Sequence, residues 1–265
     1  MLSLWQHRFL IFQMTQREVV GRYKGSVFGL AWSFLHPVLM LTVYTFVFSV
    51  VFKARWGVAT STLHESKADF AMVLFVGLIV HALFSEVLNR APLLILNNQN
   101  FVKRVVFPLE ILPVAIMGAA LFHGLISLVV MLLAFVLFNG YLHWTAILAP
   151  LVLMPLVFLT LGLAWMLASL GVFLRDVGQT VGIATTALMF LSPVFYPVSA
   201  LPVDIQPWLM ANPLTFIIEQ AREVLVWGHL PDWIGLAQYT VVALIVAWAG
   251  FAWFQKTRKG FADVL

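Results

Sequence analysis

The longest stretch of the chain without Asp, Glu, Lys or Arg covers residues 111–174, 64 residues in all. A membrane-crossing helix needs about 20 mostly apolar residues, so this stretch is too long for one crossing. It divides at Asn139-Gly140, a pair typical of a turn. Hydrophobic residues make up 62% of the chain and charged residues 10%, against about 45–50% and about 25% in soluble domains. We therefore predict a polytopic membrane protein. The same composition argues against a soluble enzyme, a nucleic-acid-binding domain or a disordered chain.

The predicted fold class is an all-α membrane protein that forms a single transmembrane domain over residues 1–265. Residues 1–26 mix apolar and charged side chains at helical spacing, which predicts an amphipathic helix lying in the inner interface. Residues 197–232 are too apolar for a free loop and too interrupted by proline for a crossing, which predicts a re-entrant or outer helical hairpin between the last two crossings. Within it, Asn212-Pro213 starts a short helix and Gly228 stops it. Six transmembrane helices are expected at residues 27–52, 70–89, 111–138, 145–174, 177–196 and 233–255.

The distribution of Lys and Arg predicts the orientation. Six crossings place both termini on the same side of the membrane. If that side is the cytoplasm, eleven of the fifteen Lys and Arg residues lie inside. The other four lie outside, namely Lys53, Arg55, Lys67 and Arg222. The positive-inside rule therefore favours cytoplasmic termini.

Motifs for chemistry are missing from the sequence. No G-x-x-x-x-G-K-[ST] phosphate loop occurs, so ATP-driven work would need an ATPase on another polypeptide. The chain has no cysteine, no H-E-x-x-H and no paired carboxylates in the predicted spans, so we predict no catalytic residue and no metal site. We expect the two mid-membrane histidines, His81 and His123, to be hydrogen-bonded packing residues rather than a proton relay.

Two patterns each leave two interpretations open. One face of the first predicted span, from Ser33 to Phe52, carries hydroxyls and aromatic rings. It fits either a surface that contacts sugars or ordinary helix packing. A basic cluster of Arg17, Arg22 and Lys24 fits either attraction to anionic lipid or a cradle for a phosphate group.

Four stretches together resemble one protein family, in the same order and over nearly the whole chain. They are REVVGRYKGSVFGLAWSFLHPVLM (residues 17–40), NNQNFVKRVVFPLEILP (97–113), FLRDVGQTV (173–181) and NPLTFIIEQAREVL (212–225). These stretches are similar to the membrane (permease) subunit of ABC transporters that export polysaccharides, the O-antigen, capsule and teichoic acid permeases.

The resemblance implies a homodimer in the bacterial cytoplasmic (inner) membrane that works with two copies of a separate ATPase subunit. ATP and Mg would bind to that partner, and this chain would hold no cofactor. The first and fifth spans would line a channel for a glycan linked to undecaprenyl pyrophosphate. The implied channel residues are Tyr44, Phe48, Phe52, Phe190, Phe195 and Tyr196, the implied pyrophosphate residues are Arg17, Arg22 and Lys24, and the implied ATPase-docking residues are Asn98, Phe101, Lys103 and Arg104.

Two alternatives stay open at this point. The same architecture serves ABC permeases for the efflux of drugs or lipids. A membrane enzyme acting on lipid-linked sugars is the alternative from another class, and the lack of convergent acidic residues disfavours it.

Overall fold

The computed structural model describes residues 5–47, 67–102 and 107–264. All regular structure in these residues is helical, and no strand occurs among them. The longer helices are α2 (Arg8–Tyr23), α3 (Trp32–Tyr44), α4 (Lys67–Arg90), α6 (Ile111–Asn139), α7 (Ala149–Phe173), α8 (Val177–Leu191), α10 (Pro213–Arg222) and α11 (Trp233–Thr257). The short ones are η1 (Gly29–Ala31), η3 (Ala91–Leu93), η4 (Leu96–Asn98), α5 (Gln99–Val102), η5 (Trp144–Leu148), η6 (Val198–Ala200), α9 (Gln206–Met210), η7 (Glu223–Trp227), η8 (Arg258–Gly260) and α12 (Phe261–Val264).

Five helical stretches in the described residues are long and apolar enough to cross a membrane. They are Gly29–Val47, Phe70–Leu93, Ile111–Asn139, Trp144–Phe173 and Trp233–Gly260. The prediction of an all-α, multi-span protein is therefore confirmed.

The predicted crossing at residues 177–196 corresponds to a shorter helix. α8 is apolar but has only 15 residues and ends at Leu191. Ser192 is in an extended conformation (φ −101°, ψ 155°), as expected for a residue that precedes a proline, here Pro193. The helix itself therefore ends five residues before the predicted end of this crossing.

Two predicted helix boundaries, the C-terminus of α6 and the N-terminus of α10, agree with the structure. Each is set by residues that are adjacent in the sequence. Gly140 ends α6 in the left-handed conformation (φ 76°), and its N–H donates to the carbonyl of Val136 at 2.8 Å. Asn212 caps α10 through its side-chain oxygen, which accepts a hydrogen bond from the N–H of Leu214 at 2.9 Å. α10 continues into the π-helical turn η7, which ends at Gly228 (φ 74°).

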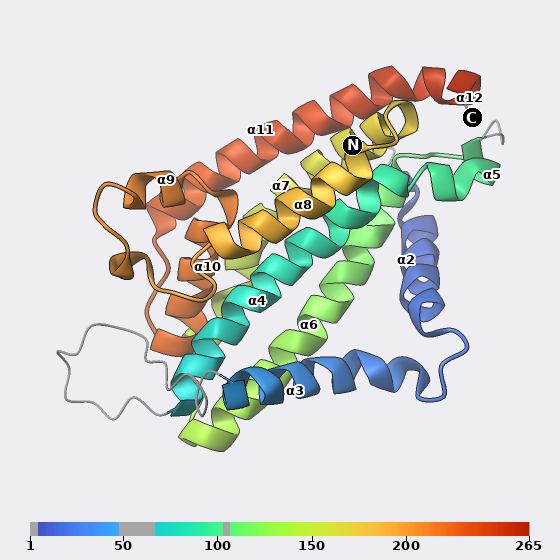
Figure 1. The fold of residues 1–265 in the computed structure, drawn as a ribbon. Helices are drawn as coiled ribbons and strands as arrows, with labels where there is room; N and C mark the ends of the chain where they lie inside the picture. Colours follow the sequence, from blue (N-terminus) through green and yellow to red (C-terminus); the bar gives the residue numbers. More distant parts are fainter. Residues whose placement is uncertain (1–4, 48–66, 103–106, 265) are drawn as a thin grey trace.

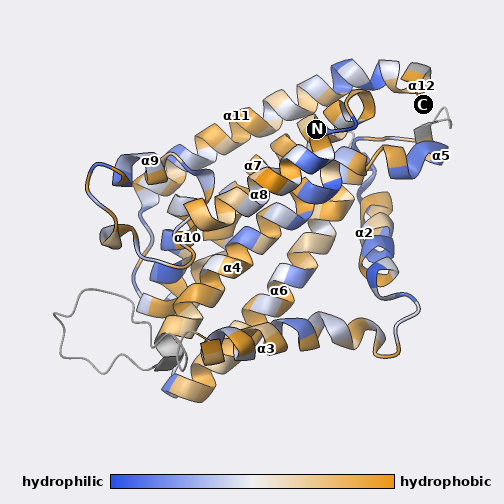
Figure 2. Ribbon diagram, in the orientation of Figure 1, coloured by the Kyte–Doolittle hydropathy of each residue, from blue (hydrophilic) through white to orange (hydrophobic). Residues whose placement is uncertain are grey.

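The long helices form a bundle with two distinct ends (Figure 1). α4, α6, α7, α8 and α11 run side by side, and α3 crosses them at a steeper angle. We call the end that carries α2, α5 and α12 the α2 end, and the opposite end, with α9 and α10, the α10 end. Apolar residues dominate the long helices, and hydrophilic residues concentrate in α2, α5 and the segments at the ends (Figure 2).

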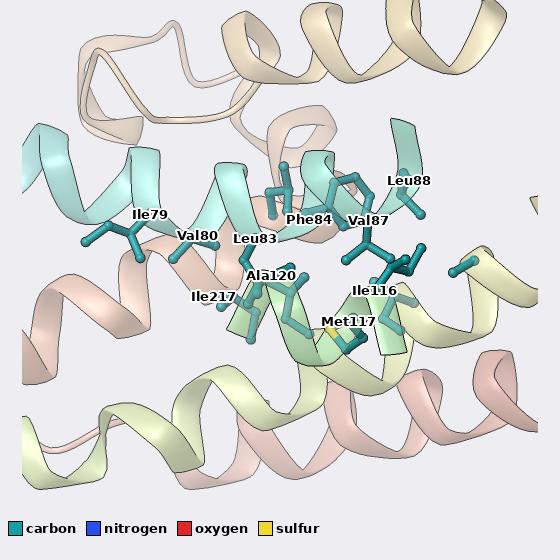
Figure 3. Close-up of a cluster of buried hydrophobic side chains, with 14 of the residues drawn as sticks. Ile79, Val80, Leu83, Phe84, Val87, Leu88, Ile116, Met117, Ala120 and Ile217 are labelled. Atoms are coloured by element: carbon teal, nitrogen blue, oxygen red, sulfur yellow. The ribbon is translucent and has the colours of Figure 1, made fainter. Parts of the chain in front are cut away.

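α4 lies at the centre of the packed core. It is apolar around most of its circumference, as expected for a helix buried on all sides. Val73, Leu74 and Val87 are fully buried. Figure 3 shows side chains of α4 facing α6, where Ile116 and Met117 lie. The elements that carry charged groups at the α2 end are thus held against a rigid apolar centre.

Candidate functional site

Charged side chains from three helices meet at the α2 end. The Nη1 group of Arg22, on α2, donates to the Glu86 carboxylate of α4 at 2.6 Å. His123 of α6 places its Nδ1 3.1 Å from the same oxygen, and Arg90 adds a more distant ion pair at 3.9 Å. Ionisable residues within apolar helices are costly unless they find partners. Glu86 therefore joins α2, α4 and α6 at one point.

A second set of contacts continues this network to the segment between η4 and α6. Glu18 forms ion pairs with Arg90 and with Arg17. Arg17 also donates to the side-chain oxygen of Asn98 at 3.2 Å, and its guanidinium lies 5.5 Å from the centre of the Phe101 ring. The structure thus brings together residues expected to contact pyrophosphate and residues expected to dock an ATPase.

The remaining residues of these two predicted groups are not part of this network. Lys24 caps the C-terminus of α2 and is exposed. Lys103 and Arg104 lie outside the described residues.

A cleft of about 780 Å³ opens between α2 and α4 at this network. We call it the polar chamber, lined in part by Arg17, Glu18, Arg22, Glu86, Asn89 and Arg90. Three arginines against two glutamates leave one net positive charge. An open cleft with guanidinium groups already oriented by carboxylates is suited to binding an anion such as a phosphate group.

Aromatic side chains gather where α8 ends, near the α10 end. The exposed Phe190 ring stacks on Phe195 with 5.8 Å between ring centres. The hydroxyl of Tyr196 donates to the carbonyl of Phe190 at 2.9 Å. These three residues, which we call the aromatic cluster, were all predicted channel residues.

The predicted channel residues of the first span are not joined to the aromatic cluster within one chain. Tyr44 is half-buried at the end of α3. α3 packs on α4 and α6, whereas α8 packs on α4 and α7, and Figure 1 shows α4 between α3 and α8. Phe48 and Phe52 lie outside the described residues.

The polar face of α3 is largely occupied by contacts within the chain. Ser33, Pro37 and Leu41 are buried. The Ser33 hydroxyl donates to the carbonyl of Leu30, and the Thr45 hydroxyl donates to that of Leu41, each at 2.7 Å. For this first part of the face, the geometry favours the packing interpretation.

Arg222 is an important buried residue that the sequence reasoning treated only as an outer charge. Its side chain is 1% exposed. It donates to the carbonyls of Val73 (3.0 Å) and Val194 (3.1 Å) and to Glu219 (2.9 Å). Burial lowers the pKa of Arg222 to about 10, against the opposing effect of Glu219. The hydrogen bonds of Arg222 therefore connect α10 to α4 and to the segment that follows α8.

The two mid-membrane histidines differ. The Nε2 of His81 lies 3.0 Å from the carbonyl of Thr185, so the prediction of a hydrogen-bonded packing residue is confirmed for His81. His123 instead belongs to the charged network around Glu86. The sequence does not indicate that His123 belongs to a charged network, because its partners Arg22 and Glu86 lie far from it in the chain.

A bundle of membrane-length apolar helices, with a charged helix at one end and short helices at the other, defines a multi-pass membrane protein. Residues 10–226 match the family described as ABC-2 type transporter. The chain belongs to this family and is a membrane permease of the ABC transporter class.

Curated relatives match the chain over most of its length. The O-antigen export system permease protein RfbA of Myxococcus xanthus is 29% identical over 263 residues, which cover 98% of this chain and 97% of the relative. A protein of the same name from Klebsiella pneumoniae is 26% identical over 97% of this chain and 95% of the relative. The polysialic acid transport protein KpsM of Escherichia coli is 22% identical over 92% of this chain and 91% of the relative.

Proposed function

We propose that this chain is the permease subunit of an ABC transporter that exports a polysaccharide linked to undecaprenyl pyrophosphate across the bacterial inner membrane. The observation that carries the proposal is the full-length similarity to relatives named for O-antigen export and for polysialic acid transport. The substrate is thus a long, hydrated glycan, and the family supports a transport role rather than an enzymatic one.

The energy for export comes from a separate ATPase subunit, present in two copies, that binds ATP and Mg. The sequence has no phosphate loop, which supports this division of labour. The ATPase docks at the α2 end, on Asn98 and Phe101 and on the neighbouring Lys103 and Arg104. The contact of Arg17 with Asn98 and Phe101 supports a docking surface that is connected to the polar chamber.

The passage for the glycan forms between two copies of the chain. Tyr44 and the aromatic cluster lie on different sides of α4, so a second copy is needed to bring such surfaces together. In this arrangement α8 and the residues up to 196 complete a sixth crossing, residues 197–232 form the outer hairpin, and both termini lie in the cytoplasm. Aromatic rings stack on the apolar faces of sugars, so Tyr44, Phe48 and Phe52 are proposed to contact the glycan together with the aromatic cluster.

A deletion strain tests the export function. We expect the strain to lose surface polysaccharide and to accumulate lipid-linked glycan inside the cell, and the wild-type chain to restore export only together with its ATPase. Unchanged surface polysaccharide in the deletion strain would contradict the proposal. Recovery of the ATPase with the purified permease tests the partnership in the same cells.

Cysteine cross-linking tests the homodimer, because the chain has no cysteine of its own. Ile183 is 72% exposed on α8, and Ile147 is 79% exposed on η5. We expect Ile183→Cys to give a covalent dimer in membranes treated with a bifunctional thiol reagent, whereas Ile147→Cys stays monomeric. Equal cross-linking of the two variants would argue against a dimer interface at α8.

A further inference from the structure

Residues 191–194 separate Phe190 from Phe195 in the chain, and we call them the α8 turn. Ser192 and Val194 of this turn are fully buried. The rings on either side reach the surface of the bundle, where Phe190 is 59% exposed and stacks on Phe195. The placement of the two rings therefore depends on the contacts that hold the buried turn.

Asn212, at the N-terminus of α10, makes the first of these contacts. Its side-chain oxygen caps α10. The Nδ2 group of the same amide donates to the carbonyl of Leu191 at 3.1 Å and to the hydroxyl of Ser192 at 2.9 Å. An amide carries an acceptor and two donors, so one side chain starts α10 and holds the α8 turn. A residue with only an oxygen would start the helix without holding the turn.

Arg222, at the C-terminus of α10, makes the second contact. Its Nη2 group donates to the carbonyl of Val194 at 3.1 Å, and its Nε group donates to the carbonyl of Val73 on α4 at 3.0 Å. Gly77 of α4 permits this approach, because a Cβ there would lie 3.0 Å from Nη2 of Arg222 and 3.3 Å from the Cα of Val194. The α8 turn is thus held between α10 and a position of α4 that has no side chain.

α10 is itself fixed to other parts of the bundle. The hydroxyl of Tyr239 on α11 donates to the carbonyl of Pro213 at 2.7 Å. Thr145 of η5 donates to the carbonyl of Val224, in the turn that continues α10, also at 2.7 Å. Ile217 is fully buried in the core that Figure 3 shows. α10 therefore provides a rigid reference against which the α8 turn is placed.

We propose that Asn212 and Arg222 are positioning residues for the aromatic cluster. They hold the two ends of the α8 turn, so that Phe190 and Phe195 keep the spacing and tilt at which a sugar ring stacks on them. Arg222 is 1% exposed and acts through the turn, not by contact with the glycan. The inference rests on the proposed function for the ligand, a sugar with an apolar ring face, and on the hydrogen bonds alone for the geometry.

Cross-linking of two introduced cysteines tests the geometry without any glycan. The chain has no cysteine of its own. Phe190→Cys/Phe195→Cys therefore places one thiol at each of two positions whose rings lie 5.8 Å apart. Tyr196→Phe is added to this parent chain, because the Tyr196 hydroxyl also bonds across the turn, to the carbonyl of Phe190. The purified chain in detergent reacts with a short bifunctional thiol reagent, and mass spectrometry of the monomer follows the intramolecular product.

Two variants of this parent release the turn. Asn212→Ser keeps a capping hydroxyl for α10 but has no amide group to reach the α8 turn. Arg222→Lys keeps the charge but replaces a planar group with several donors by a single nitrogen. The matched control for the first is Asp232→Ser, the loss of a larger cap on α11, where the carboxylate accepts from the N–H groups of Ile234 and Gly235.

We expect Asn212→Ser and Arg222→Lys to slow the intramolecular cross-link at least about threefold, because the effective concentration of one thiol at the other falls. Asp232→Ser should react at the rate of the parent. If Arg222→Lys does not fold, Asn212→Ser decides alone. An unchanged rate in either folded variant, or an equal decrease in Asp232→Ser, would overturn the proposal.

The response to glycan separates this inference from the proposed function. The permease–ATPase complex, with Phe190, Phe195 and Tyr196 intact, is assayed for ATP hydrolysis with lipid-linked glycan extracted from the deletion strain. We expect Asn212→Ser to raise the glycan concentration for half-maximal stimulation about three- to tenfold, as the loss of one or two hydrogen bonds would, with the maximal rate unchanged.

The opposite pattern, a lower maximal rate at an unchanged half-maximal concentration, would show a purely structural role for Asn212 and would overturn the positioning role. If the wild-type complex does not respond to the glycan at all, the proposed function is wrong. The cross-linking rates still decide in that case whether α10 holds the two rings in place.

Discussion

The close packing of α7 against α11 predicts that adding one methyl group at Gly162 lowers the free energy of unfolding. α7 and α11 cross at Gly162 and Gly250, where each glycine faces the backbone of the other helix. A Cβ at Gly162 would lie 2.5 Å from the carbonyl oxygen of Val246 and 2.7 Å from backbone atoms of Ala247. Ordinary contact begins at 3.4 Å, so Gly162→Ala requires α11 to retreat by about 0.7–0.9 Å.

The expected cost follows from this displacement. A gap of about 0.5–1 Å removes a quarter to a half of the dispersion energy of each contact that it separates. Overpacking of this kind lowers the free energy of unfolding by about 1–3 kcal/mol. The substitution also raises the free energy of unfolding by about 0.5–1 kcal/mol, because alanine restricts the unfolded chain more than glycine does. This gain offsets part of the overpacking cost. We therefore expect Gly162→Ala to lower the melting temperature by several degrees, at about 2–4 °C per kcal/mol.

Thermal unfolding of the purified chain in detergent, followed by tryptophan fluorescence, measures the effect. Gly182→Ala is the matched control, because a Cβ there meets nothing within 4 Å, and it should melt at or slightly above the wild-type temperature. The double variant Gly162→Ala/Gly250→Ala should cost much less than the sum of the single ones, since the first substitution already separates the helices. Equal melting temperatures for Gly162→Ala and Gly182→Ala would refute the close approach.

Three further predictions concern the two ends of the bundle. Thr145 is fully buried and its hydroxyl donates to the carbonyl of Val224 at 2.7 Å, so Thr145→Val should lower the free energy of unfolding by about 1–3 kcal/mol in the same assay. Burial raises the pKa of Glu219 despite the opposing effect of Arg222, so the folded chain holds this proton to higher pH than the unfolded chain does. The associated stability is present below the ordinary pKa of a glutamate and is lost as the pH rises from there through the raised pKa of the folded chain. The melting temperature of the wild type relative to Glu219→Gln should therefore fall over this rise in pH, and a constant difference would contradict the assignment. Phe101→Ala removes the ring beneath the Arg17 guanidinium and should reduce the ATPase recovered with the permease, whereas full recovery would place docking elsewhere.

The features that were predictable from the sequence are those that depend on neighbouring residues. A run of apolar residues is enough to specify a helix of membrane length, and glycine after such a run is enough to end it. Gly140 and Gly228 both end helices in the left-handed conformation, where glycine has no steric penalty. The short helix after Asn212 followed from a capping side chain and a proline that lie next to each other.

The features that were not predictable depend on residues that are far apart in the chain. Arg22 and His123 reach the same Glu86 carboxylate across separations of 64 and 37 residues. Arg222 bonds to the carbonyl of Val73, 149 residues away. Charge counting placed Arg222 among the outer cations. Which partner it finds is decided by packing, which no local pattern specifies.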